Sequence, residues 1–179
     1  VSNTLNVPSK EKIILITGSN MAGKSTFLRT VGINIILAVA GAPVCAEVFE
    51  TSVVTVFSSM RTKDSLQESE SSFFAELKAL KKIIDVVEAE QMPIFFLMDE
   101  ILKGTNSNDR HQGSVALIRQ LLHHKGVGII ATHDLDLGTM ENRTDGKGEN
   151  WCFEVEITKE GKMIFDYTFK RGVCQSMNA

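Results

Sequence analysis

The chain has 179 residues, enough for one α/β domain with a substantial buried core. Its formal net charge of −3 gives no basic excess, so composition provides no electrostatic footprint for nucleic acid, and DNA, if bound, is expected to be held elsewhere. Three cysteines without a Cys-x-x-Cys pair favour reduced thiols over a disulfide framework or a zinc site. The most apolar stretch, residues 33–46, is too short to span a bilayer, so we expect a cytoplasmic protein without membrane contact.

The first half of the chain predicts two strands and two helices. Residues 12–17 form a compact apolar, β-branched run typical of a strand buried on both faces. A helix is expected at residues 25–40, a second strand at 53–57 and a polar surface loop at 61–70. From residue 71 to about 90, apolar residues recur at helical spacing, which predicts a second helix.

Pro93 ends the second helix and opens the C-terminal half. The elements expected after it are a strand, a helix, another strand and an antiparallel hairpin, at residues 94–98, 109–123, 127–132 and 151–157 with 163–169. Strands that alternate with helices indicate a mostly parallel sheet flanked by helices, with the hairpin at an antiparallel edge. We expect residues 1–179 to form one domain of a longer chain.

A phosphate-binding pattern follows the first predicted strand. GSNMAGKST fits G-x-x-x-x-G-K-[ST] at every fixed position. Its glycines let backbone N–H groups surround phosphates, Lys24 adds positive charge, and the Ser25 hydroxyl can bind Mg²⁺. The position between a buried strand and a helix N-terminus favours this function over a chance match. We therefore expect ATP and Mg²⁺ as cofactors, bound by Gly18, Ser19, Asn20, Met21, Ala22, Gly23, Lys24, Ser25 and Thr26.

Two later strands end in residues that suit phosphate chemistry. The apolar run 94–98 is followed by Asp99 and Glu100, at the edge of the sheet where open α/β folds bind ligands. We expect Asp99 to hold Mg²⁺ together with Ser25, and Glu100 to polarise the attacking water. Two acids can also simply cap a strand. His133 follows the strand at 127–132 and is the second predicted catalytic residue, although such a histidine is often an ordinary loop residue.

A serine heads the second predicted helix. Ser71 can act as its N-cap, and the same capped N-terminus can present N–H groups and a hydroxyl to a γ-phosphate. Along the chain, the glycine-rich loop is followed by the serine-headed helix, the strand that ends in Asp-Glu and the strand that ends in His. This order favours an ABC-type ATPase, because a RecA-like ATPase needs no serine-headed helix. An adenylate-type kinase would need a lid and an acceptor site that the sequence does not show. The predicted fold class is therefore α/β, a P-loop NTPase of ABC type.

Several segments resemble one family. TGSNMAGKST at residues 17–26 resembles the T-G-P-N-M-x-G-K-S-T loop of MutS-type mismatch-repair ATPases, and LMDEILKGTN at 97–106 resembles their L-x-D-E-x-x-x-G-T-[ST]. Ser71-Ser72-Phe73 with Glu76 resembles the S-T-F-x-x-E of the same family, and residues 131–133 resemble its A-T-H. Residues 41–47 resemble its G-[SC]-[FY]-V-P-A segment. Near the C-terminal end, Tyr167, Gly172 and Ser176 resemble its Y-x-x-x-x-G-x-x-x-S. The resemblance covers essentially the whole chain.

The resemblance implies a Mg²⁺-dependent ATPase domain of a MutS-like DNA repair protein. In that family the ATPase domains form a dimer, and the serine-headed helix of one subunit caps the ATP of the other, which would be the role of Ser71 in a homodimer. DNA is held by upstream domains that this chain lacks. The sequence departs from the family at Ser19, at Leu102-Lys103 and at Ser69-Glu70. The last two departures leave a MutS-related paralogue as the alternative to a mismatch-recognition protein. The adenine-stacking aromatic residue of the family would lie at or before Val1.

Two other classes of function remain open. An ABC-type ATPase of another DNA-maintenance or transport system shares the same parts, but a transporter subunit should carry an L-S-G-G-Q-like signature where this chain has residues 70–74, ESSFF. A non-enzymatic module switched by ATP would lack a catalytic acid, and Glu100 is present.

Overall fold

The fold is taken from a computed structural model that describes residues 2–7, 11–19, 21–60, 72–89, 92–158 and 163–174. The surface loop expected at residues 61–70 lies outside these ranges, and so do Asn20, Ser71 and Ser176.

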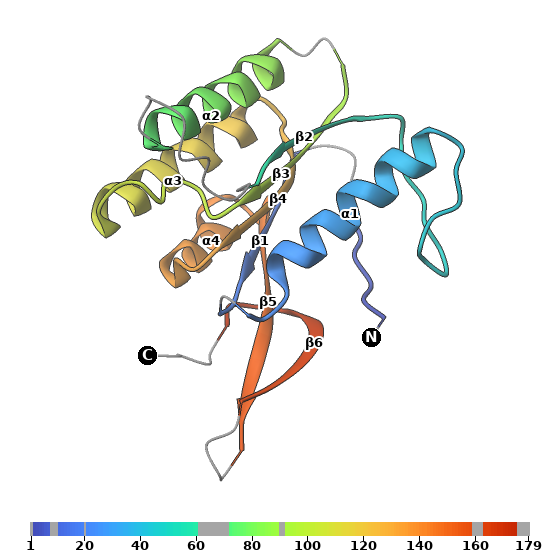
Figure 1. The fold of residues 1–179 in the computed structure, drawn as a ribbon. Coiled ribbons are helices and arrows are strands. Elements are labelled where there is room, and N and C mark those ends of the chain that lie inside the picture. The colour runs from blue at the N-terminus through green and yellow to red at the C-terminus, as the bar shows by residue number, and fades with distance from the viewer. Residues whose placement is uncertain are drawn as a thin grey trace.

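Six strands form one sheet in the order β2-β3-β4-β1-β5-β6 (Figure 1). Their bounds are Lys12–Thr17 for β1, Thr55–Ser59 for β2, Ile94–Asp99 for β3, Val127–Thr132 for β4, Gly148–Ile157 for β5 and Met163–Arg171 for β6. Strand β5 runs parallel to β1 on one side and antiparallel to β6 on the other. The sheet is therefore mixed, its antiparallel edge is the one expected from the sequence, and the described residues form a small α/β domain.

Helices cover both faces of the sheet. In Figure 1, α1 lies on one side, and α2, α3 and α4 lie on the other. The helical bounds are Lys24–Val39 for α1, Ser72–Glu88 for α2, Ser107–His123 for α3, Leu135–Thr139 for the 3₁₀ helix η1 and Met140–Arg143 for α4.

Two hydrophobic cores result, one on each face, and β1 contributes to both. Ile13 and Leu15 pack with α2 and α3, whereas Ile14 and Ile16 pack with α1. All four side chains are fully buried. A strand buried on both faces shows an uninterrupted apolar run instead of alternation, which is the pattern of residues 12–17.

The observed elements differ from the expected ones in a few places. Strand β2 lies two residues later than expected, because its parallel register pairs Thr55 with Ile94 of β3. Helix α3 begins earlier than expected, where the Asn106 side chain accepts a hydrogen bond from the Asp109 N–H at 2.9 Å. The short segments η1 and α4 were not expected, since neither is long enough to show helical periodicity.

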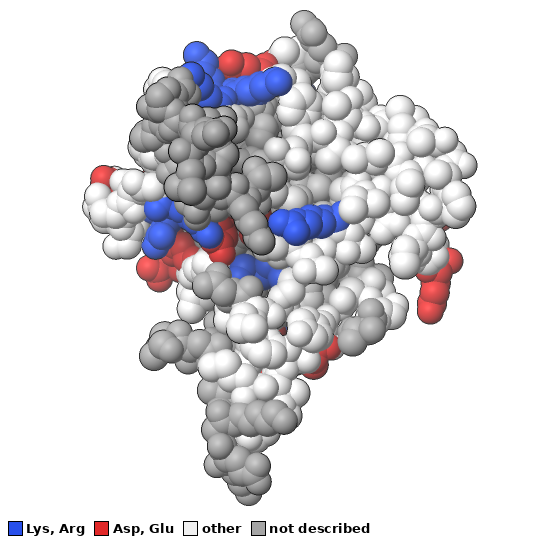
Figure 2. All heavy atoms as spheres, in the orientation of Figure 1, with Lys and Arg blue, Asp and Glu red and all other residues white. Residues whose placement is uncertain are grey.

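The sequence-based expectations also concern the surface charge, the cysteines and the hydrophobicity of the helices. On the face in Figure 2, Lys and Arg side chains are scattered among Asp and Glu and form no continuous band over the described residues. Cys45 is exposed, Cys152 and Cys174 are buried, and none of these three residues forms a disulfide. Among the helices in the described part of the chain, none combines the length and the hydrophobicity that a bilayer span requires.

Candidate functional site

The carboxyl ends of β1, β3 and β4 meet at one edge of the sheet. Thr17, the last residue of β1, pairs with Thr132, the last residue of β4, and Asp99 of β3 pairs with Ala131. The segments that follow these strands therefore start side by side. This edge is where open α/β sheets bind their ligands.

A glycine-rich loop, residues 18–23, connects β1 to α1, and two of its glycines cannot be replaced without strain. Gly18 has φ +147°, and a Cβ there would lie 2.7 Å from the carbonyl oxygen of Phe153 on β5. Gly23 has φ +99° and would bring a Cβ to 3.1 Å from the ring of Tyr167 on β6. Gly23 is also the N-cap residue of α1, which has no side-chain cap. The first N–H groups of α1 are thus available to an anion.

Lys24 is folded back into this loop. Its Nζ donates hydrogen bonds to the carbonyl oxygens of Gly18 at 2.6 Å and Ser19 at 2.7 Å, and the residue is 2% exposed. Burial lowers the pKa of the Lys24 amine to about 8, against the opposing effect of the Asp99 carboxylate. A buried ammonium that donates to neutral carbonyls is suited to exchange them for a stronger, charged acceptor.

Besides Glu100 Oε2, which is in an ion pair with Lys103, two buried oxygens at this edge lack hydrogen-bond partners within the described residues: Asp99 Oδ1 and Ser19 Oγ. An unpaired buried carboxylate oxygen is costly, and a hard cation such as Mg²⁺ prefers such oxygen ligands. The half-buried Ser25 lies in the first turn of α1, after Lys24. Asp99 and Ser25 therefore fit the magnesium-binding role that the sequence predicts for them.

Glu100 and His133 contact each other directly. Nε2 of His133 meets Oε1 of Glu100, while Nδ1 donates to the Gly18 carbonyl oxygen at 3.0 Å. The other carboxylate oxygen, Oε2, forms an ion pair with Lys103. Burial, followed by the positive charge of Lys24, lowers the pKa of His133. Since Nδ1 already donates to Gly18, a proton must lie between Nε2 and Glu100, on one partner or the other.

Comparison with known proteins decides the family. The model of the MutS domain V family matches residues 14–178. The chain belongs to the MutS domain V family. It is 34% identical over 176 residues to the DNA mismatch repair protein MutS of Chlorobium phaeobacteroides, which covers 96% of this chain and 19% of that protein. It is 28% identical over 184 residues to MutS protein homolog 4 of the mouse, covering 99% of this chain and 19% of the relative. The chain thus spans about a fifth of the length of these relatives.

The family finding corrects part of the expectation. The match is to MutS domain V, a family of its own, so the predicted assignment to an ABC-type ATPase domain is wrong. The fold class is corrected with it: MutS domain V is a small α/β domain with a mixed sheet and not a P-loop NTPase of ABC type. The antiparallel β5–β6 edge itself is as predicted. The relation to MutS proteins is confirmed by the family match and by the relatives.

The structure of this MutS domain V chain brings together only some of the residues assigned from sequence. The functional groups of five of them gather at one sheet edge: Gly18, Lys24, Asp99, Glu100 and His133. Ala22 is instead part of the hydrophobic core, and Met21 is 73% exposed. Thr26 is exposed on α1. Asn20 and Ser71 lie outside the described residues, so their predicted roles remain predictions.

Three contacts around this site were not predicted. Lys103 pairs with Glu100, and its only sequence signal was the departure from Gly-Arg at that position. The carboxylate of Glu76, a residue of the serine-headed motif, accepts a hydrogen bond from the Leu102 N–H. A Cβ at Gly104 would lie 2.6 Å from Cβ of Phe73, so the start of α2 packs closely against the loop after β3.

Proposed function

We propose that this MutS domain V chain binds ATP with Mg²⁺ at the carboxyl edge of its sheet and hydrolyses it to ADP and phosphate. The observation that carries the proposal is the buried ammonium of Lys24, which lies inside a glycine-rich loop beside Asp99 and the Glu100–His133 contact. The relative from Chlorobium phaeobacteroides is named as a DNA mismatch repair protein, so we propose the same process for the longer protein to which this domain would belong.

Binding would begin with an exchange of partners at Lys24. The β- and γ-phosphates of ATP replace the carbonyl oxygens of Gly18 and Ser19 as acceptors for Nζ, so that two neutral acceptors give way to charged ones. The uncapped N–H groups of α1 add further donors and the positive end of the helix dipole. When bound to Ser25 and Asp99, Mg²⁺ neutralises phosphate charge.

Hydrolysis requires a base beside the γ-phosphate, and Glu100 is the proposed one. When the shared proton is on His133 Nε2, Glu100 is an ionised carboxylate and can accept a proton from water. The water oxygen then bonds to the γ-phosphorus as the bond to the leaving ADP oxygen breaks. His133 Nδ1 meanwhile stays anchored to the carbonyl of Gly18, which keeps the Glu100–His133 contact next to the phosphates.

We further propose a homodimer in which the head of α2 caps the nucleotide of the second subunit, with DNA held by other domains. The resemblance to the MutS family supports this role for Ser71, and the first turn of α2 contains no acidic residue that would repel a phosphate.

Glu100→Gln tests the enzymatic proposal, because it removes the base and keeps the size of the side chain. We expect turnover to fall about 10²- to 10⁴-fold while ATP binding persists. Both quantities should be measured in the longer protein, by phosphate release and by calorimetry. Wild-type protein that binds ATP but releases no phosphate would favour a non-enzymatic switch. A Glu100→Gln variant with normal turnover would show that another group activates the water.

A further inference from the structure

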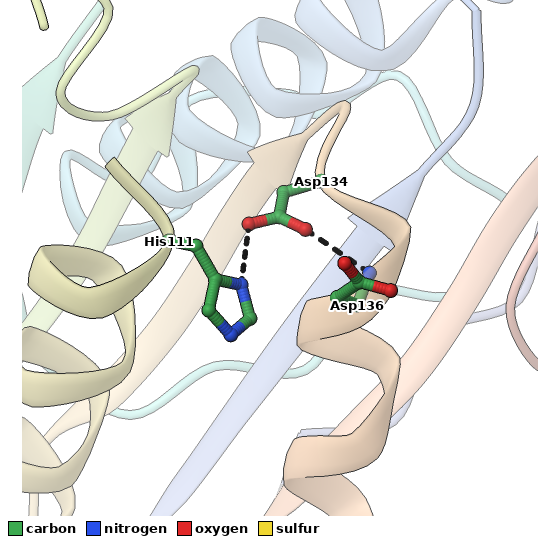
Figure 3. A group of neighbouring side chains, drawn as sticks. All are labelled: His111, Asp134 and Asp136. Carbon is green, nitrogen blue, oxygen red and sulfur yellow. Dashed lines mark hydrogen bonds and ion pairs between the residues drawn. The ribbon is translucent and has the colours of Figure 1, made fainter. Parts of the chain in front are cut away.

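A second polar cluster joins helix α3 to the segment after β4 (Figure 3). His111 of α3 and Asp134 approach each other, with 2.7 Å between Nδ1 and Oδ2. The other carboxylate oxygen, Oδ1, accepts a hydrogen bond from the Asp136 N–H at 3.0 Å. The side chains of His111 and Asp134 are 30% and 12% exposed, so solvent competes only partly for this contact.

This cluster fixes the residue directly after His133. The Asp134 N–H donates to the Thr132 hydroxyl at 3.0 Å, and its carboxylate caps η1 through Asp136. The bond from His111 ties this turn to helix α3. The backbone on the C-terminal side of His133 is therefore held by α3 as well as by its own sequence neighbours.

Helix α3 is also connected to Glu100. Residues 101–106 lead from Glu100 directly into α3, and Asn106 caps that helix. The two partners of the Glu100–His133 contact are thus joined to one helix by different routes, Glu100 through the covalent chain and His133 through the His111–Asp134 bond. The Glu100 N–H also donates to the Ala131 carbonyl of β4 at 2.8 Å, which fixes the backbone of Glu100 against the same strand. What the His111–Asp134 bond adds is the placement of the turn that carries His133.

We propose that His111 is a positioning residue for His133, which it holds against Glu100 through Asp134. The expected effect of His111 on the rate of hydrolysis rests on the proposed ATPase function. Its effect on the position of His133 does not. His111 does not touch the reacting atoms and acts only through the turn at residues 132–136.

A divalent metal ion is the competing occupant of the cluster. One ligand atom from each of His111, Asp134 and Asp136 lies within 4.8 Å of the others. The hydrogen-bonded arrangement is favoured because both carboxylate oxygens of Asp134 already accept bonds, one from an imidazole and one from a backbone N–H. A metal at Nδ1 would require that nitrogen to give up its proton.

The first experiment does not depend on hydrolysis. The chain contains four histidines, so histidine-selective labelling gives a simple NMR spectrum of the imidazoles. In nucleotide-free protein, His111→Ala should shift or broaden the His133 signals. His123→Ala is the matched control, because His123 is an exposed residue at the far end of the same helix, and it should leave them unchanged. Unchanged His133 signals in His111→Ala would overturn the proposal.

Further variants and a metal titration control this experiment for misfolding and for metal binding. Asp134→Asn keeps an oxygen for the cap and should perturb His133 as His111→Ala does, while His111→Asn retains an N–H donor and should restore the wild-type signals. Titration of nucleotide-free protein with Mn²⁺ alone should leave His111 sharp. Selective broadening of His111 would identify a metal site and overturn the hydrogen-bonded assignment.

The second experiment is a double-mutant cycle on ATP hydrolysis. His111→Ala should lower kcat about 10- to 100-fold, the loss expected from a misplaced catalytic group, with KM nearly unchanged. In a His133→Ala background the same substitution should have no further effect on kcat. Additive losses would show that His111 acts independently of His133 and would contradict the proposal. If wild-type protein does not hydrolyse ATP, the proposed function fails, and the NMR result alone decides the positioning role.

Discussion

The carboxylate of Glu76 on α2 accepts a hydrogen bond from the backbone N–H of Leu102, two residues after Glu100. Leu102 has φ +58° and Glu100 has φ +55°, a backbone region that residues other than glycine seldom adopt. Such strain persists only where surrounding contacts enforce it. Helix α2 therefore helps to hold the proposed catalytic acid in its conformation.

Replacement of Glu76 should release this strained segment. Glu76→Ala leaves the Leu102 N–H without its charged acceptor and should lower the free energy of unfolding by about 1–3 kcal/mol. Glu76→Gln keeps an acceptor oxygen and should lose less. Urea denaturation of both variants provides the measurement. Equal stability of Glu76→Ala and wild type would mean that the segment is held by other contacts.

Removal of the Lys24 ammonium should weaken nucleotide binding. Lys24→Ala deletes a charge-assisted contact to the phosphates, so the affinity for ATP should fall about tenfold or more, as measured by calorimetry. Lys82→Ala, on the exposed face of α2, is the control and should bind ATP normally. Wild-type affinity in Lys24→Ala would contradict the assignment of the glycine-rich loop.

The lowered pKa of Lys24 predicts two effects of pH. Nucleotide affinity should decline above about pH 8, as the free protein loses the ammonium charge. Because the pKa in the folded protein lies below 10.5, the folded state binds fewer protons than the unfolded state between pH 8 and 10.5, and the contribution of this group to stability should rise with pH in that window. Lys24→Met should remove both effects, which calorimetry and denaturation at several pH values would reveal.

The proposed sharing of nucleotides between subunits can be tested by complementation. Ser71→Ala should leave ATP binding by one subunit nearly intact and slow both ATP-driven dimerisation and hydrolysis. In a mixture of Lys24→Ala and Ser71→Ala chains, one composite site carries both substitutions and the other carries neither, so turnover should partly recover. A mixture that forms heterodimers without any recovery would favour a simple N-cap role for Ser71.

The sequence predicted the strands better than it predicted the site. Residues 12–17 form β1 as expected, because a strand buried on both faces leaves a continuous apolar run. The gathering of Lys24, Glu100 and His133 at one edge followed from the positions of the strand ends. The His111–Asp134 contact, by contrast, joins residues 23 apart in the chain and depends on how α3 packs against β4. Such packing leaves no periodic signal in the sequence.

The antiparallel strands β5 and β6 at the edge of the sheet also contact the glycine-rich loop. Gly18 lies against the Phe153 carbonyl of β5, and Gly23 lies against the Tyr167 ring of β6. Immediately before the loop, the Thr17 hydroxyl accepts a hydrogen bond from the Cys174 N–H at 2.9 Å, just after β6. A mechanical load on the chain at Cys174 would therefore reach the glycine-rich loop through one hydrogen bond and one peptide unit.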